Sequence, residues 1–333
     1  MEKKIFENFN LKEELKERNT KKMGWIPVAQ RPNGSWIQIP IMIATGAKDG
    51  VTVLADGCNH GDEYEGPEAI ADAFYKLDTS KMSGNFVGVP AVNIEAFAQM
   101  MRYNTTDFVP LDLNRIYPGS PAGPMTAYLC NFYTENVLKQ VDALITIHGG
   151  GNCEYLEPVV LYCGEDGEIA NTSREMAEAF GFNVLWKNMR YDAGSGIEDE
   201  HAYTLGIPAI TPEIGGQCTR LNGLREENVA RACQGILNVL TYFHVLEGET
   251  PKTEEQHHYD IDYIFNHHGG VHKPLKKQLD EVKKGDVLSE IYNVFGEKID
   301  EVIAPFDGVV IGYWTYSVCQ PHSWVYMVGK KMD

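Results

Sequence analysis

LADGCNHGDEYEGPEA, residues 54–69, combines the end of an apolar strand, a tight turn and the start of a helix. Gly57 ends the apolar run, and Pro67 is typical of the first turn of a helix. A strand that passes through a short turn into a helix is the building unit of a largely parallel α/β sheet. His60 and Glu63 lie within this turn, three residues apart.

The same alternation of apolar runs and helical segments extends over residues 25–249. The predicted strands are 25–30, 36–46, 51–57, 85–93, 143–150, 158–163, 182–187 and 207–216. The predicted helices are 67–77, 125–141, 172–181 and 225–246. Because these strands are apolar on both faces, we expect an α/β fold with a mixed, largely parallel sheet and helices on both faces.

The chain also changes character along its length. Residues 1–24 form a polar N-terminal extension, and the polar segment 250–262 is typical of a linker. Residues 263–333 consist of short runs separated by Gly, Pro and Lys-Gly turns, which predicts a small C-terminal all-β domain. We interpret this β domain as a lid or an assembly surface.

Composition narrows the classes of partner. The formal charge is −18, from 47 acidic and 29 basic residues, which argues against nucleic acid or an anionic membrane as a partner. The seven cysteines include no CxxC pair and are typical of reduced thiols. The charged N-terminal segment predicts no secretory signal, so we expect a cytoplasmic protein. The sequence does not determine the oligomeric state, and a homo-oligomer is possible.

Polar side chains follow three of the predicted strands, where α/β sheets bind ligands. The turn after 51–57 carries His60 and Glu63, strand 143–150 carries His148, and strand 207–216 carries Glu213. Two imidazoles and one carboxylate that leave a position for water are a common catalytic zinc set. HGGG at residues 148–151 is also found in serine esterases, but the required GxSxG motif is absent from the sequence.

A second group of polar residues lies in MRYNTTDFVPLDLNRIYPG. Arg102 and Arg115 are its cations, and Asn114 directly precedes Arg115. A guanidinium can bind a carboxylate with two parallel hydrogen bonds, and a neighbouring amide can orient that carboxylate. The Gly-rich segment 188–206 is a candidate substrate loop, in which Arg190 would bind a second charge.

These motifs resemble the succinylglutamate desuccinylase/aspartoacylase family, which is related to the zinc carboxypeptidases. The resemblance covers about residues 25–330 and is carried, in order, by NHGDEYEG, DLNRIYPG, IHGGG and TPEIGG. It implies a zinc carboxypeptidase-like fold and one zinc ion per chain. The implied roles are zinc ligand for His60, Glu63 and His148, catalytic carboxylate for Glu213, carboxylate clamp for Asn114 and Arg115, and carbonyl polarisation for Arg102. Nine residues separate Arg102 from Asp112, more than the family usually has.

The resulting hypothesis is a zinc-dependent amidohydrolase that deacylates an N-acyl amino acid or a similar small carboxylate. In it, Glu213 is the general base for a metal-activated water. Two alternatives remain open at this stage. One is a metallocarboxypeptidase acting on short peptides, and the other is a non-catalytic zinc-binding protein whose β domain recruits a partner.

Overall fold

The structure is a computed structural model that describes residues 3–217 and 224–332. Its first part contains β1 (Lys3–Ile5), α1 (Leu11–Glu14), β2 (Thr20–Gln30), β3 (Trp36–Thr45), β4 (Lys48–Gly57), α2 (Glu65–Lys76), η1 (Thr79–Lys81), β5 (Ser83–Val89), α3 (Ile94–Gln99), η2 (Leu113–Arg115), α4 (Met125–Asn136), η3 (Leu138–Gln140), β6 (Ala143–Ile147), β7 (Glu154–Cys163), α5 (Glu168–Phe180), β8 (Val184–Asn188), α6 (Glu198–Thr204), β9 (Ala209–Gly216) and α7 (Leu224–Tyr242). Its second part contains β10 (His257–Phe265), β11 (Gly270–Pro274), β12 (Glu281–Val282), β13 (Val287–Tyr292), β14 (Lys298–Ile303), β15 (Gly308–Trp314), β16 (Val318–Cys319) and β17 (Trp324–Met332).

Every predicted strand and helix of the first part has a counterpart in the structure. The large sheet has the order β1-β2-β3-β5-β4-β6-β9-β7-β8-β10-β17-β15-β12. Its centre, β5-β4-β6-β9, is parallel. The pairs β2–β3, β3–β5 and β7–β9 are antiparallel, so the sheet is mixed as predicted but less parallel than expected. The short turn 31–35 joins β2 directly to β3, and such a hairpin forces an antiparallel pair.

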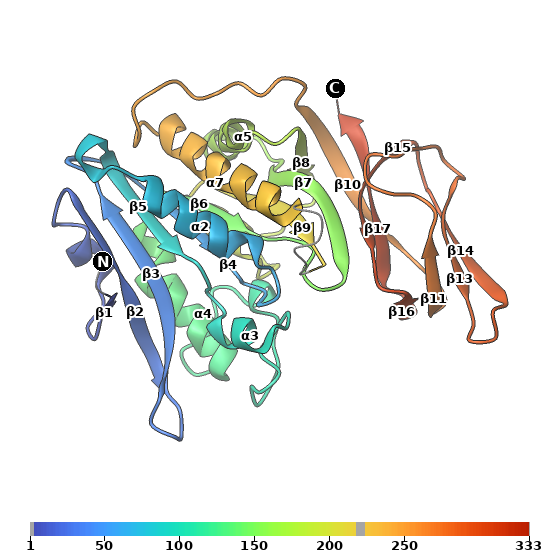
Figure 1. Cartoon of the computed structure of the whole chain (residues 1–333), viewed down its shortest axis with the longest axis horizontal. Helices are drawn as coiled ribbons and strands as arrows, with labels where there is room; N and C mark the ends of the chain where they lie inside the picture. Colours follow the sequence, from blue (N-terminus) through green and yellow to red (C-terminus); the bar gives the residue numbers. More distant parts are fainter. Residues whose placement is uncertain (1–2, 218–223, 333) are drawn as a thin grey trace.

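The helices cover both faces of this sheet, as the sequence predicts. Along β4, Val53 and Ala55 join the core beneath α2, α5 and α7, whereas Leu54 joins the core on the side of α1, α4 and α6. Neighbouring strand residues point to opposite faces, so an all-apolar strand supplies both cores. α2 and α7 pack against each other over one face (Figure 1). Burying a side chain such as Phe74 of α2 contributes about 2–3 kcal/mol.

The second part of the chain is built from strands, and some of them continue the large sheet. β10 pairs in parallel with β8, and β15 pairs with β7. β14, β13, β11 and β16 form a separate four-stranded sheet, seen at the right of Figure 1. β2 spans the predicted boundary at residue 24, and β10 occupies part of the predicted linker. The division into domains therefore stays a prediction.

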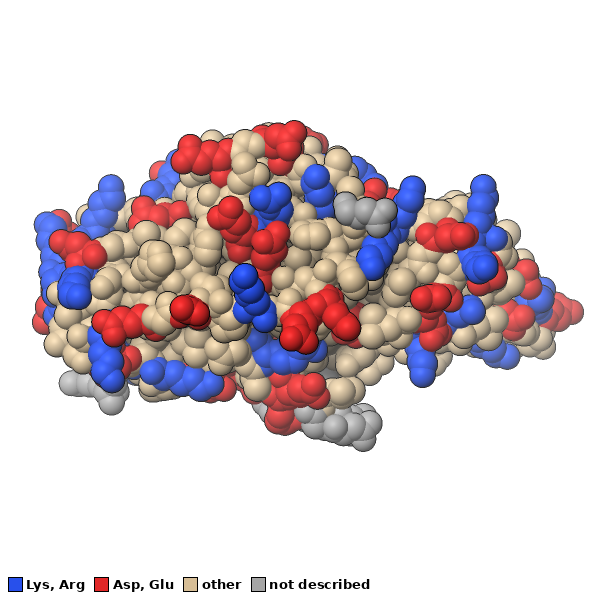
Figure 2. All heavy atoms as spheres, turned by 90° about the horizontal axis from the view of Figure 1, so that it is seen from above, with Lys and Arg blue, Asp and Glu red and all other residues tan. Residues whose placement is uncertain are grey.

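The surface carries charges of both signs, and the cysteines form no disulfides among the described residues. Figure 2 shows acidic and basic side chains interspersed over the face seen from above. Six cysteines of the described residues are free, and Cys218 lies outside the described residues. Within 3–217 and 224–332, none of the helices has the length and apolar character needed to cross a membrane.

Candidate active site

The turn between β4 and α2 is held in place by its own buried residues. Asn59 donates hydrogen bonds to Thr146 Oγ1 of β6 at 3.2 Å and to Glu198 Oε2 of α6 at 2.6 Å. Gly61 lies so close to α3 that a Cβ atom there would overlap the backbone of Ala96. The amide anchor and the missing side chain together fix the turn against its neighbours, and this sets the positions of its polar residues.

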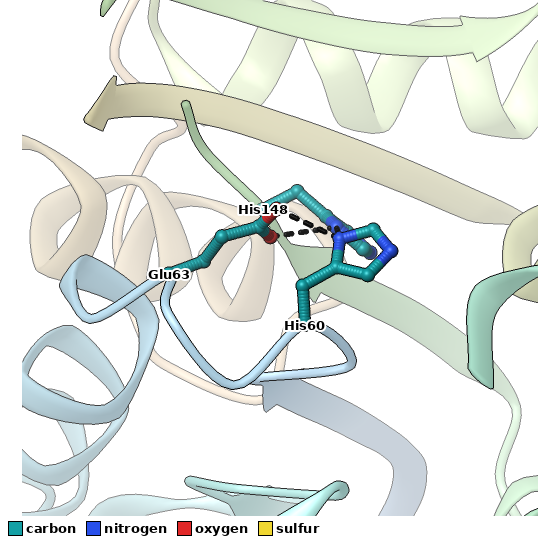
Figure 3. A group of neighbouring side chains, drawn as sticks. All are labelled: His60, Glu63 and His148. Atoms are coloured by element: carbon teal, nitrogen blue, oxygen red, sulfur yellow. Dashed lines mark hydrogen bonds and ion pairs between the residues drawn. The ribbon is translucent and has the colours of Figure 1, made fainter. Parts of the chain in front are cut away.

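His60 and Glu63 in this turn meet His148, which follows β6 (Figure 3). Glu63 Oε1 lies 2.7 Å from His60 Nδ1, and Glu63 Oε2 lies 2.9 Å from His148 Nδ1. All three residues are buried, and their candidate ligand atoms lie within 4.8 Å of one another. Burial would raise the pKa of Glu63, but the two imidazoles hold it well below its usual range. These three side chains could together hold a metal ion.

Asp112 links the metal-ligand candidates to Arg102. Its Oδ1 lies 3.0 Å from His60 Nε2, and its Oδ2 accepts a hydrogen bond from Arg102 Nε at 3.1 Å. Histidine ligands of metals commonly bond to a carboxylate through the second ring nitrogen. Burial opposes ionisation of Asp112, yet His60 and Arg102 together lower its pKa. The long segment between Arg102 and Asp112 therefore forms a loop whose two ends meet.

Glu213 lies on β9, where it forms a β-bridge with His148. The residue keeps some contact with solvent, but its carboxyl group is surrounded by protein. Burial raises the pKa of Glu213 to about 7, and the charge of Glu63 acts in the same direction while His148 opposes it. A carboxyl group with this pKa can both accept and return a proton near neutrality.

Asn114 and Arg115 lie in η2, directly after Asp112. The backbone N–H of Glu198 donates to Asn114 Oδ1 at 2.8 Å, which fixes the orientation of the amide. Asn114 Nδ2 then faces His148 Nε2 at 3.3 Å. Arg115 Nη1 donates to the carbonyl oxygen of Asn114 at 2.6 Å. The amide of Asn114 is thus held beside the imidazole of His148, and the guanidinium of Arg115 is tied to the same short helix.

A cavity of about 510 Å³ opens over these side chains. The seven candidate residues from the sequence line it together: His60, Glu63, Arg102, Asn114, Arg115, His148 and Glu213. They come from separate segments, so the fold brings together what the sequence distributes over 154 positions (60 to 213). The individual roles assigned to them remain predictions.

The cavity also has lining residues that the sequence did not single out. Glu154 of β7 is one, and the β domain adds an apolar wall of Tyr263, Phe265, Trp314, Trp324 and Met327. Only strand pairing between the two parts of the chain places this wall, so no local motif marks it. The expectation that Arg190 binds a second charge of the substrate is corrected by the structure. Arg190 lies outside the cavity lining and pairs with Asp260 and Asp262 of β10.

Comparison with known proteins yields one matching family description. Residues 49–243 match the succinylglutamate desuccinylase/aspartoacylase catalytic domain. An N-alpha-acetyl-L-2,4-diaminobutyric acid deacetylase of Halomonas elongata is 27% identical over 264 residues, 78% of this chain and 75% of that protein.

Solved structures share the fold. The product-bound ectoine utilization protein EutE (DoeB) of Ruegeria pomeroyi has a TM-score of 0.84 at 24% identity and covers 94% of this chain and 96% of its own. A succinylglutamate desuccinylase/aspartoacylase of Rhodobacter sphaeroides has a TM-score of 0.85 at 24% identity and covers 95% and 97%. At this identity the likeness concerns the fold alone.

Proposed function

Because this chain belongs to the succinylglutamate desuccinylase/aspartoacylase family, we propose that it is a zinc-dependent hydrolase of amide bonds. Its substrate is an N-acyl amino acid or a similar small carboxylate, and the reaction removes the acyl group. The main support is the convergence of His60, Glu63, His148 and Glu213 on one cavity. The name of the Halomonas elongata relative, a deacetylase of an N-acetylated amino acid, is consistent with this substrate class.

The proposal includes one zinc ion held by His60, Glu63 and His148. These residues fit a metal, because two imidazoles and one carboxylate are buried with their ligand atoms in mutual reach. Glu63 Oε2 is buried and lies 2.9 Å from His148 Nδ1, and Glu63 Oε1 lies 2.7 Å from His60 Nδ1. A buried carboxylate is costly unless its charge is compensated, and a cation held by these three residues would compensate it.

Zinc at this position would supply a Lewis acid that lowers the pKa of a bound water to about 7. Glu213 takes the proton of the attacking water and returns it to the leaving amine. Arg102 stabilises the negative charge that develops on the carbonyl oxygen. Asn114 and Arg115 bind the substrate carboxylate through an amide and a guanidinium, and this places the scissile bond beside Glu213.

The proposal keeps two further expectations from the sequence. The first is that the α/β domain has the fold of the zinc carboxypeptidases. The second is that the protein is cytoplasmic, because its cysteine usage is typical of a reducing compartment.

The test combines metal analysis with turnover. We expect about one zinc per chain, and hydrolysis of N-acetyl or N-succinyl amino acids in preference to dipeptides. Glu213→Gln should retain zinc and lose about 100-fold or more in kcat, because the amide cannot accept the proton. Preferred cleavage of dipeptides would indicate a carboxypeptidase. Zinc binding without hydrolysis of any amide would indicate a non-catalytic zinc protein.

A further inference from the structure

Glu154 and Trp314 lie side by side in the cavity, although 159 residues separate them along the chain. The two residues are paired across the β7–β15 ladder. Thr315 strengthens this junction, because its backbone N–H and its hydroxyl donate to the carbonyl oxygen of Cys153 at 2.8 and 2.9 Å. Side chains of directly paired strand residues are neighbours on the same face of the sheet. A carboxylate and an indole therefore share one region of the cavity wall.

Glu154 has no cationic partner among the described residues of the chain. Its carboxylate is within weak hydrogen-bonding distance of Cys153 Sγ, at 3.8 Å. The nearby Arg102 forms its ion pair with Asp112 instead, at 3.0 Å. Burial raises the pKa of Glu154 well above its ordinary value, and the charge of Glu213 adds to this effect while Arg102 opposes it. Burial in the cavity wall thus disfavours the charged form of Glu154, and a cation bound beside it would stabilise that form.

Trp314 supplies the second half of a cation site. Its indole Nε1 donates to the carbonyl oxygen of Val318 at 2.9 Å, which holds the ring in place. Tyr263 and Trp324, with ring centroids 5.1 Å apart, continue the aromatic wall of the cavity. Aromatic faces attract ammonium groups within about 6 Å. An acid beside aromatic rings therefore suits an ammonium group better than a carboxylate or an alkyl chain.

We infer that Glu154 and Trp314 form a subsite for an ammonium group on the substrate. This inference rests on the proposed function and narrows it. The α-nitrogen of an N-acyl amino acid is an amide and carries no charge, so the ammonium group belongs to the side chain. The substrate class is then an N-acyl amino acid whose side chain ends in a primary amine. Arg115 binds its carboxylate, and Glu154 binds the opposite end.

The first experiment compares substrates that differ only in this group. Nα-acetyl derivatives of diamino acids with one to four side-chain methylenes are each paired with the analogue in which a methyl group replaces the ammonium group. We expect the wild-type protein to favour one amine-bearing member by about 10- to 100-fold in kcat/KM. Glu154→Gln should bring this ratio close to one, and Trp314→Leu should lower it. Glu157→Gln, a change on the same strand outside the cavity lining, should leave it unchanged.

The second experiment measures equilibrium binding and does not depend on hydrolysis. Calorimetry gives the Kd of each free diamino acid and of its methyl analogue for the zinc-loaded wild type and the three variants. The same preference, lost in Glu154→Gln and kept in Glu157→Gln, would support the subsite even if no amide were cleaved. Equal affinity for both members of every pair, or an unchanged preference in Glu154→Gln, would overturn it.

Discussion

Replacing Asp112 by asparagine should weaken zinc binding and catalysis by separable amounts. Asp112 accepts from Arg102 and from the backbone N–H of Asn114, and it bonds to the ring of His60. An asparagine oxygen can replace one carboxylate oxygen toward His60, but its NH₂ group would face the donors of Arg102. Losing the carboxylate partner of a metal-ligating histidine typically costs 10- to 100-fold in metal affinity, and we expect that range here.

The effect on Arg102 follows from its exposure. A hydrogen bond to a charged group contributes about 1.5–3 kcal/mol, but the Arg102 side chain is 41% exposed and solvent screens the pair. A loss of about 1 kcal/mol is then expected, which is about fivefold in kcat/KM when zinc is saturating. The Kd of zinc is measured by competition with a chelating dye, and kcat/KM is measured with an N-acetyl amino acid.

Asp107→Asn provides the matched control for this prediction. Asp107 lies in the same loop, but its carboxylate accepts from Thr126 at the start of α4. Its replacement should lower thermal stability and leave the Kd of zinc unchanged. The reasoning would be refuted if Asp112→Asn held zinc as tightly as the wild type, or if both variants weakened zinc binding equally.

Further predictions concern pH and packing. If Glu213 is the base, kcat/KM should rise about tenfold from pH 6 to pH 8, because burial raises its pKa to about 7, and Glu213→Gln should show a flat profile. Gly61→Ala should lower the melting temperature by the equivalent of about 2 kcal/mol, because the new methyl group overlaps Ala96. Burial raises the pKa of Asp56 to about 6 and that of Glu198 well above its ordinary value. The stability contributed by the protonated carboxyl groups is therefore complete below about pH 4, and the Asp56 part is lost as the pH rises through about 6. Melting temperatures measured from pH 4 to pH 8 should therefore fall less in Glu198→Gln than in the wild type.

Local signals explain how much of this fold could be predicted from the sequence. The apolar run of β4, the glycine at its end and the proline in α2 specify a strand, a turn and a helix within 20 residues. α1 was missed because it has only four residues, which is too short for a helical pattern. It is stabilised by burial of Leu11 in the core rather than by its own propensity.

The parts of the site that could not be predicted depend on contacts between distant segments. Asp112 has no motif that links it to His60, because the contact depends on how the loop after α3 folds back. Glu154 precedes the predicted strand 158–163, and its place beside Trp314 follows only from the pairing of β15 with β7. Sequence spacing identifies ligands that share a turn, but it does not show which residue from another strand lies opposite.

The position of the C-terminal part within the large sheet bears on substrate selection. β10 pairs with β8 at the edge of the first part of the sheet. β7 contains Glu154 and pairs with β15. Backbone ladders therefore hold the aromatic wall at a fixed register to the strand that follows the His148 loop. A wall carried by a loosely tethered domain would move relative to the metal ligands and could not distinguish side chains by length. Pairing across β7–β15 instead fixes the separation between the proposed ammonium subsite and the scissile bond, so the length of the substrate side chain becomes a criterion for selection.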